Sequence, residues 1–349
     1  MNANTKNIRD LHAADARLSI EVTRRCNSAC IHCFAGTGEN APGEIDFALL
    51  RAMIREGAEA GYRHLHITGG EPLLYPDIFK ALDCALDQGY ASILLNTNGL
   101  LLDNKTCQRL AARPGLTLSI SLEASERLHN RFRGAASYRK VVKGLQIALA
   151  AELDVIIFTL ACKSVLPDLP TFADELFGRF PRIKYLALNR LRKPAVSNRR
   201  LEKEYLSPND FLGLVRTVSL LNLINRPTVF LDDPLANVVN RIMKIPWMPA
   251  STPLQRYGNL MILTDRRLSL SHTSHARFGR YRSRAINSIQ SSDRYQQAFS
   301  TRRQVCHTCP YGHLCREGGL IRPSDAPWTG KEDTHFCKAV LKLASTPFH

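Results

Sequence analysis

Three cysteines, Cys26, Cys30 and Cys33, lie within eight residues and are spaced C-x3-C-x2-C. This spacing does not suit the common zinc knuckle, which pairs two closely spaced cysteines with a second pair of ligands. Three neighbouring thiolates suit a 4Fe–4S cluster, which normally takes four cysteines and here would keep one iron open to a substrate or cofactor. The alternatives without a catalytic role are a loop that binds a structural metal and three core cysteines that bind nothing.

Two further motifs follow strands that the apolar pattern predicts. A Gly-Gly-Glu-Pro motif at 69–72 comes after the strand 63–68, and an Asn-Thr-Asn-Gly motif at 96–99 ends the strand 91–96. The cysteine loop itself follows an apolar, β-leaning run. In parallel sheets and barrels, sites gather at the carboxyl ends of the strands. We therefore expect the three motifs to form one shared site.

Strands and helices alternate from this first strand to about residue 224. The predicted strands are 18–23, 63–68, 91–96, 116–122, 154–161 and 183–188. The predicted helices are 47–60, 76–88, 105–112, 138–151, 169–178 and 208–222. Six such units favour an α/β fold with a parallel sheet and right-handed crossovers, which is either a partial (β/α)6 TIM-type barrel or a doubly wound open sheet.

The cysteine loop and the Gly-Gly-Glu-Pro motif together resemble the radical S-adenosylmethionine (radical SAM) enzymes. Their cysteine motif is C-x3-C-x-φ-C, and His32 stands at the φ position. The resemblance covers about residues 15–340 and implies the partial barrel. It also implies an enzyme of oxidoreductase or lyase type, in which a reduced 4Fe–4S cluster cleaves S-adenosylmethionine (SAM) to a 5′-deoxyadenosyl radical that removes hydrogen from a substrate. A reducing electron donor such as flavodoxin or ferredoxin is implied too.

The same resemblance implies which residues contact SAM. The two glycines of the 69–72 motif would let the backbone approach the ligand closely, and its glutamate would accept from the amino group of SAM. His32 would pack near the adenine, and Arg133 would face the SAM carboxylate. The family's usual Asp-Gly after the fourth strand is Glu123-Ala124 here, which puts the role of that position in doubt. The expected set is His32, Gly69, Gly70, Glu71, Pro72, Asn96, Ser121, Glu123 and Arg133.

A second group of four cysteines, Cys306, Cys309, Cys315 and Cys337, follows a hairpin candidate at 260–270. By spacing alone, these cysteines suit zinc and a second 4Fe–4S cluster equally well. Beside a radical SAM core they resemble the SPASM/twitch extension, which implies one auxiliary 4Fe–4S cluster. The predicted organisation is an N-terminal arm over 1–17, a radical SAM core over 18–224 and an auxiliary-cluster domain over 225–349.

The formal net charge is +16, and arginines gather in two segments. Arginine forks match carboxylate and phosphate, so an acidic substrate is predicted, although an arginine-rich composition on solvated faces explains the charge equally well. One segment comprises Arg190, Arg192, Lys193, Arg199 and Arg200, and the other comprises Arg277, Arg280, Arg282 and Arg284. The resemblance implies two substrate classes, a ribosomal peptide or a tetrapyrrole.

A protein of another class remains as an alternative, namely a basic nucleic-acid-binding or nucleic-acid-modifying protein with structural zinc sites. No aromatic-rich basic repeat supports it. The sequence has no long apolar run and no secretory signal, so we predict no membrane partner. Clustered cysteines suit metal binding better than a disulfide framework, and they fit a reduced cytoplasm.

Overall fold

The computed structural model describes residues 16–33, 35–191, 199–224, 228–245, 249, 257–272, 277–300, 309–316 and 331–346. Their strands form one nine-stranded sheet in the order β7-β6-β5-β4-β3-β2-β1-β8-β9. The strands are β1 (Arg17–Glu21), β2 (His64–Thr68), β3 (Ser92–Thr97), β4 (Leu116–Ser121), β5 (Asp154–Ala161), β6 (Tyr185–Arg190), β7 (Thr228–Leu231), β8 (Leu260–Ile262) and β9 (Leu268–Ser269).

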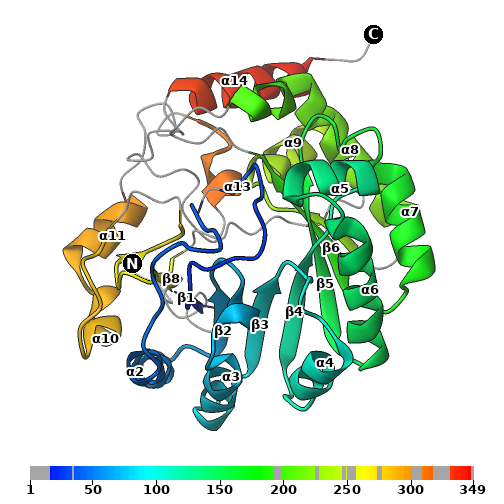
Figure 1. Cartoon of the computed structure of the whole chain (residues 1–349). Coiled ribbons are helices and arrows are strands. Elements are labelled where there is room, and N and C mark those ends of the chain that lie inside the picture. Colours follow the sequence, from blue (N-terminus) through cyan, green and yellow to red (C-terminus); the bar gives the residue numbers. More distant parts are fainter. Residues whose placement is uncertain are drawn as a thin grey trace.

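The order of the strands decides between the two predicted architectures. Strands β1 to β7 are all parallel and neighbour one another in chain order. A doubly wound sheet reverses its strand order at a switch point, and no reversal occurs here. The sheet curves, and its helices lie along the outside of the curve (Figure 1). The predicted partial TIM-type barrel is confirmed.

The helices agree closely with the predicted ones where the capping signals are strong. Asp46 caps α2 through its side chain, which accepts from the amides of Ala48 and Leu49. Ser207 and Asp210 form a reciprocal capping box before α8. The described helices are α2 (Phe47–Glu59), α3 (Ile78–Asp87), α4 (Asn104–Ala111), α5 (Glu126–Arg133), α6 (Ser137–Ala150), α7 (Leu169–Arg179), α8 (Pro208–Ile224), α9 (Leu235–Met243), α10 (Ala285–Ile289), α11 (Asp293–Ser300), α13 (Gly312–Arg316) and α14 (Lys331–Ser345), with 3-10 turns η1 (Pro72–Leu74) and η2 (Arg199–Glu204).

The prediction that the alternation stops near residue 225 is wrong. Strand β7 and helix α9 add a further unit, and β7 pairs parallel to β6. The four residues of β7 are too few to give a periodic signal in the sequence. The predicted hairpin is present as β8 and β9, but it joins the barrel sheet, because β8 pairs parallel to β1. The sheet therefore runs across the predicted domain boundary.

The segment that follows the hairpin is docked on the first βα unit. Glu56 of α2 is buried, and its carboxylate accepts from the Tyr281 hydroxyl at 2.8 Å and from the Ile286 amide at 2.6 Å. The Tyr62 hydroxyl donates to the Gly258 carbonyl at 2.8 Å. These buried polar contacts fix the residues around α10 against the outside of α2.

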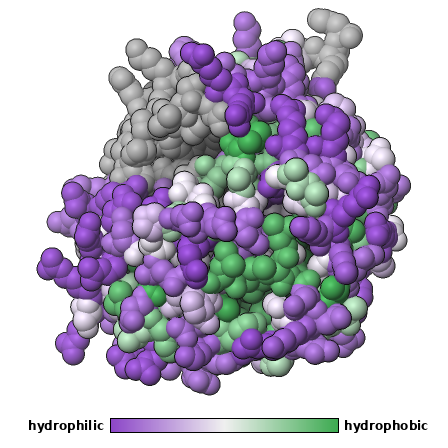
Figure 2. Space-filling view, viewed as in Figure 1, coloured by the Kyte–Doolittle hydropathy of each residue, from purple (hydrophilic) through white to green (hydrophobic). Residues whose placement is uncertain are grey.

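The main core lies between the convex face of the sheet and the surrounding helices. In β1, Leu18 and Ile20 are fully buried in this core, and the alternating Ser19 and Glu21 point to the concave face. Ser19 Oγ lies 3.1 Å from Nδ1 of His66 on the neighbouring strand. The concave face is thus polar near β1 and β2. The outer surface is mostly hydrophilic, with hydrophobic residues gathered near the middle of the face in Figure 2. Within the described ranges, every helix is too short or too polar to cross a lipid bilayer.

Candidate active site

The Gly-Gly-Glu-Pro turn packs against the backbone that leads into the cysteine loop. The Gly70 amide donates to the Thr23 carbonyl, and the Glu71 amide donates to the Arg25 carbonyl, each at 2.8 Å. A Cβ atom at Gly69 would lie 2.5 Å from the Thr23 carbonyl oxygen, and one at Gly70 would clash with the Arg25 carbonyl. The sequence predicted that these glycines admit a ligand. In the structure, they admit the chain segment that carries Cys26.

Glu71 connects the ends of β2 and β3. Its side chain is fully buried and accepts from the Leu73 amide at 3.1 Å, the Thr97 hydroxyl at 2.9 Å and the Asn98 amide at 2.7 Å. Burial raises the pKa of Glu71 to about 7, against the lowering effect of these hydrogen bonds. Protein donors bond to both oxygens, so this carboxyl links the ends of β2 and β3, and its contact with the amino group of SAM stays a prediction. Pro72 is buried at the start of η1, directly after it.

Asn98 contacts the cysteine loop, whereas the sequence analysis had chosen Asn96 from the same motif. Asn98 Nδ2 donates to Asn27 Oδ1 at 2.7 Å and lies 3.8 Å from Cys26 Sγ. Asn96 lies two residues earlier, within β3, and its side chain forms a hydrogen bond with His66. The signal that could have identified Asn98 is the glycine after it, because Gly99 has a φ of 81° and ends the strand in a tight turn.

The other side of the cysteine loop rests on the end of α5, a helix that the sequence analysis did not predict. The Ile31 amide donates to the Phe132 carbonyl at 2.9 Å, and Ser28 Oγ donates to the Arg133 carbonyl at 2.8 Å. The ring of His32 meets that of Phe132 edge to face, with centroids 5.9 Å apart. Burial lowers the pKa of His32 to about 3, and the charge of Arg133 lowers it further. His32 is therefore a neutral imidazole at this wall of the site.

Glu123 and Arg133 form a buried ion pair at the end of β4. Arg133 Nε donates to Glu123 Oε1 at 2.7 Å, and the Leu160 amide donates to Glu123 Oε2 at 2.9 Å. The Glu123 side chain is fully buried. A direct contact between Glu123 and SAM was predicted, but both of its oxygens are already bonded within the protein. Ser121 is half-buried at the same strand end, where it pairs in register with Phe158 of β5.

The three cysteines of the loop differ in exposure. Cys26 is buried, Cys30 is half-buried and Cys33 is exposed, and all three are free thiols. Burial is the main reason that the pKa of Cys26 is raised to about 11. In the part of the chain that the structure describes, no three His, Cys, Asp or Glu side chains converge as closely as one ion requires. A 4Fe–4S cluster takes one thiolate on each iron, so its ligands stand farther apart than those of a mononuclear site.

The C-terminal cysteines come from separate helices. Cys315 lies on α13 and Cys337 on α14, with Cys309 just before α13, and Cys306 falls outside the described residues. Helices α13 and α14 both contact α9, and α14 also contacts α8 (Figure 1). The Phe336 ring packs edge to face on Phe211 at 5.7 Å.

The basic segment after β6 does not provide the set of free charges that the sequence suggested. Arg190 is buried, and its Nε donates to Asp233 Oδ2 at 2.6 Å. Its guanidinium also lies 4.6 Å from the centroid of the Phe336 ring. Arg190 therefore supports the packing of α14. Arg199 and Arg200 are exposed, whereas Arg192 and Lys193 lie outside the described residues.

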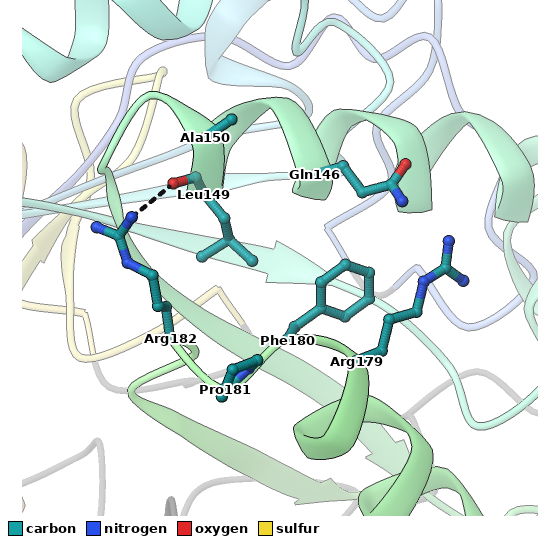
Figure 3. A pocket seen from close by; sticks show the side chains of 7 residues that line it. All are labelled: Gln146, Leu149, Ala150, Arg179, Phe180, Pro181 and Arg182. Carbon is teal, nitrogen blue, oxygen red and sulfur yellow. Dashed lines mark hydrogen bonds between the residues drawn. The ribbon is translucent and has the colours of Figure 1, made fainter.

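A surface pocket, drawn in Figure 3, lies at the end of the barrel opposite to the cysteine loop. It is lined by Gln146, Leu149, Ala150, Arg179, Phe180, Pro181 and Arg182. These residues lie in the last turns of α6 and α7 or directly after α7 and precede β5 and β6, so they belong to the amino ends of the strands. The cysteine loop is at the carboxyl ends, and this pocket is therefore separate from the candidate site.

Comparison with known proteins agrees with the site at the carboxyl ends. Residues 20–175 match the Radical SAM superfamily. The mycofactocin maturase MftC of Mycobacterium ulcerans is 30% identical over 166 residues, which cover 46% of this chain and 45% of that protein. The AdoMet-dependent heme synthase of Methanosarcina barkeri is 31% identical over 152 residues, which cover 43% of each chain. This chain thus spans less than half the length of either relative.

A solved structure shares the fold over a greater length. Native anSMEcpe with bound AdoMet and Cp18Cys peptide matches with a TM-score of 0.69 at 15% identity, over 94% of this chain and 97% of that chain. The likeness extends the barrel comparison beyond α7, within which the family match ends. None of these comparisons supports the alternative of a nucleic-acid-binding protein with zinc sites. The residues that match the Radical SAM superfamily include the cysteine loop and its glycine turn.

Proposed function

We propose that the protein is a radical SAM enzyme whose site lies at the carboxyl ends of β1 to β4. One observation carries the proposal: the loop of Cys26, Cys30 and Cys33 is fastened to the ends of β2 and β3 on one side and to α5 on the other. When bound, the cluster and SAM supply an electron and a 5′-deoxyadenosyl radical that removes hydrogen from a substrate. Cys26, Cys30 and Cys33 would hold the cluster.

The chain's own residues orient and shield this chemistry. The bonds that Glu71 accepts fix the ends of β2 and β3 in one relative position, and Asn98 extends this support to the loop. The buried pair of Glu123 and Arg133 fixes a positive charge at the opposite wall. Such pre-organised groups act without reorganising during the reaction. SAM would lie between these walls, beside His32, Gly69, Gly70 and Ser121.

For the substrate, we propose a peptide. The support is the likeness over nearly the whole chain to a structure with a bound peptide, together with the match to a peptide maturase. A tetrapyrrole is the second candidate, because a heme synthase matches a similar length of the chain at similar identity. Exposed Arg280, Arg282 and Arg284 could meet acidic groups of either substrate. A low-potential donor such as flavodoxin or ferredoxin and a cytoplasmic location belong to the same proposal.

We also propose that Cys306, Cys309, Cys315 and Cys337 hold a second 4Fe–4S cluster. Anaerobic reconstitution with iron and sulfide tests both cluster proposals, and about 8 irons per chain are expected from two clusters of four. About 4 irons with one zinc would contradict the auxiliary cluster only. With dithionite and SAM, the protein should form 5′-deoxyadenosine, and a fully loaded protein that forms none would overturn the proposed function.

A titration separates the two substrate classes. An iron porphyrin that bears propionate groups is added to the reconstituted protein, and its Soret band is followed. An unchanged band would remove the tetrapyrrole candidate. A shift of the band that weakens with rising salt would favour it over the peptide, because arginine–carboxylate contacts at an exposed site are screened by ions.

A further inference from the structure

Arg133 is held in place by partners that leave its charge close to the cysteine loop. Its Nε donates to Glu123 Oε1 at 2.7 Å, and the Leu160 amide fixes the other oxygen of that carboxylate. The exposed fractions of the two side chains are 9% for Arg133 and 0% for Glu123. Water screens a charge in such surroundings weakly, so Arg133 acts strongly on its neighbours. The guanidinium has five N–H donors, and the hydrogen bond to Glu123 uses the one on Nε.

Cys30 is the cysteine that Arg133 and its helix approach. Ser28 Oγ donates to the Arg133 carbonyl at 2.8 Å, and the same oxygen lies 3.2 Å from Cys30 Sγ. The side chain of Arg133 also forms a hydrogen bond with Cys30. The end of α5 thus brings a fixed cation and a hydroxyl to one of the three thiolates.

We propose that Arg133 and Ser28 raise the reduction potential of the cluster through the Cys30 thiolate. On reduction, the cluster takes one electron from an external low-potential donor, and no bond to Arg133 forms or breaks. A positive charge and a hydrogen bond at a ligating sulfur stabilise the state with the additional electron. The inference rests on the proposed function and assigns to the pair of Glu123 and Arg133 a positioning role beyond SAM binding.

This role differs in a measurable way from the SAM contact that the family resemblance implies for Arg133. A residue that only binds the SAM carboxylate changes the affinity for SAM and leaves the SAM-free cluster unchanged. A residue that acts through Cys30 changes the cluster before SAM is added. The decisive quantity is therefore the midpoint potential of the cluster in the absence of SAM.

The experiment compares reconstituted variants in redox titrations followed by electron paramagnetic resonance. To keep the signals of two clusters apart, every protein also carries Cys337→Ala. The principal variant is the double substitution Glu123→Gln with Arg133→Gln, which removes the charges of both partners and so avoids an unpaired buried carboxylate. Arg133→Lys keeps the charge, and Ser28→Ala removes only the hydroxyl. Arg127→Gln removes an exposed positive charge from the same helix and is the matched control.

We expect the double variant to need a more negative potential. At the solution potential at which half of the parent protein's cluster is reduced, the ratio of reduced to oxidised cluster in the double variant should be about tenfold lower. This corresponds to a shift of about 59 mV for one electron. Ser28→Ala should shift in the same direction by less. Arg133→Lys should lie near the parent protein, and Arg127→Gln should not differ from it.

The inference would be overturned if the double variant, Ser28→Ala and the parent protein had equal cluster midpoint potentials without SAM. This holds even if the variants bind SAM more weakly. If the double variant does not fold, Ser28→Ala decides alone, because it leaves the ion pair intact: an unchanged potential overturns the inference. A parent protein that assembles no cluster at Cys26, Cys30 and Cys33 would contradict the proposed function instead, so the two failures are distinguishable.

Discussion

The two groups of cysteines are built in different ways. Cys26, Cys30 and Cys33 lie on one loop, and backbone hydrogen bonds tie that loop to neighbouring strand ends and to α5. Cys315 and Cys337 lie on two separate helices, α13 and α14, instead of on one loop. The first group depends on the geometry of the barrel, and the second depends on how helices pack on α8 and α9.

This difference indicates which substitutions should disrupt each site. Backbone bonds at the end of a parallel sheet form as soon as the strands align, so the first loop gains its shape with the barrel itself. Helix packing depends on a few large side chains, such as Phe336 against Phe211 and Arg190. The C-terminal group should therefore be lost by changes that leave the barrel intact, and the reverse should not occur.

The largest effect is expected from the cysteines themselves. Cys30→Ala removes a thiolate from a cluster that has only three, so formation of 5′-deoxyadenosine should be abolished. Cys337→Ala should lower the iron content by about four and stop product formation, while some SAM cleavage without product continues. Iron analysis and chromatography of 5′-deoxyadenosine measure both results. A Cys30→Ala protein that still cleaves SAM under dithionite would contradict the assignment of the first site.

A smaller effect should follow from loosening α14. Phe336→Ala removes a half-buried ring that contacts Phe211 and Arg190, and we expect about 3 kcal/mol of lost stability, the lower end for such truncations. The auxiliary iron should be lost and the iron at Cys26, Cys30 and Cys33 kept. Leu343→Ala, at an exposed position of the same helix, is the control and should keep all of the iron. Equal loss of iron from both sites in Phe336→Ala would contradict the claim that the two groups of cysteines depend on different parts of the fold.

The glycine turn offers the converse test, in which the barrel end is disturbed. Gly70→Ala places a methyl group against the Arg25 carbonyl, which is backbone and cannot rotate away, so about 2–3 kcal/mol of destabilisation is expected. Gly38→Ala is the matched control in the same loop region, because no atom lies within 4 Å of its Cβ position. Thermal unfolding and the iron content of the first site report the difference. Similar melting temperatures for the two variants would show that the close approach is not required.

The barrel, the cysteine loop and the glycine turn could be predicted because their signals are local. An apolar pattern over strands of five or more residues, an Asp or Ser cap, and a fixed cysteine spacing are all visible in a short window of sequence. Strand β7, with four residues, and α5, with a mostly polar sequence, gave weak signals. The parallel pairing of β8 with β1 joins Leu18 to Leu260, and no local pattern reports a contact over such a separation.

Side-chain partners were the least predictable part of the site. Glu71, Glu123 and Arg190 were expected to face a ligand, since charged residues at strand ends commonly do so. Each is buried and bonded within the protein, and a ligand contact of any of them stays a prediction. The partners Thr97, Leu160 and Asp233 lie 26, 37 and 43 residues away in the sequence. Which charged group is neutralised internally thus depends on the register between strands, and the type of residue alone does not decide it.

The smallest effect concerns Glu21, which links the hairpin to the barrel. Its buried carboxylate accepts from the amide and the hydroxyl of Thr264, each at 3.0 Å, and lies 3.2 Å from His272 Nε2. Burial acts to raise the pKa of Glu21, yet His272 and Thr264 lower it below its usual 4.5. Because the folded pKa is the lower one, the stabilisation is present above pH 4.5 and is lost as the pH falls through the folded value.

Near neutral pH, Glu21→Gln should therefore lower the free energy of unfolding by about 1.5–2 kcal/mol, and this difference should shrink below pH 4.5. Denaturant unfolding at a series of pH values measures it, with Thr264→Val as a control that removes one donor and should cost less. Parallel stability curves for the parent protein and Glu21→Gln down to acid pH would mean that this carboxylate does not couple the hairpin to β1.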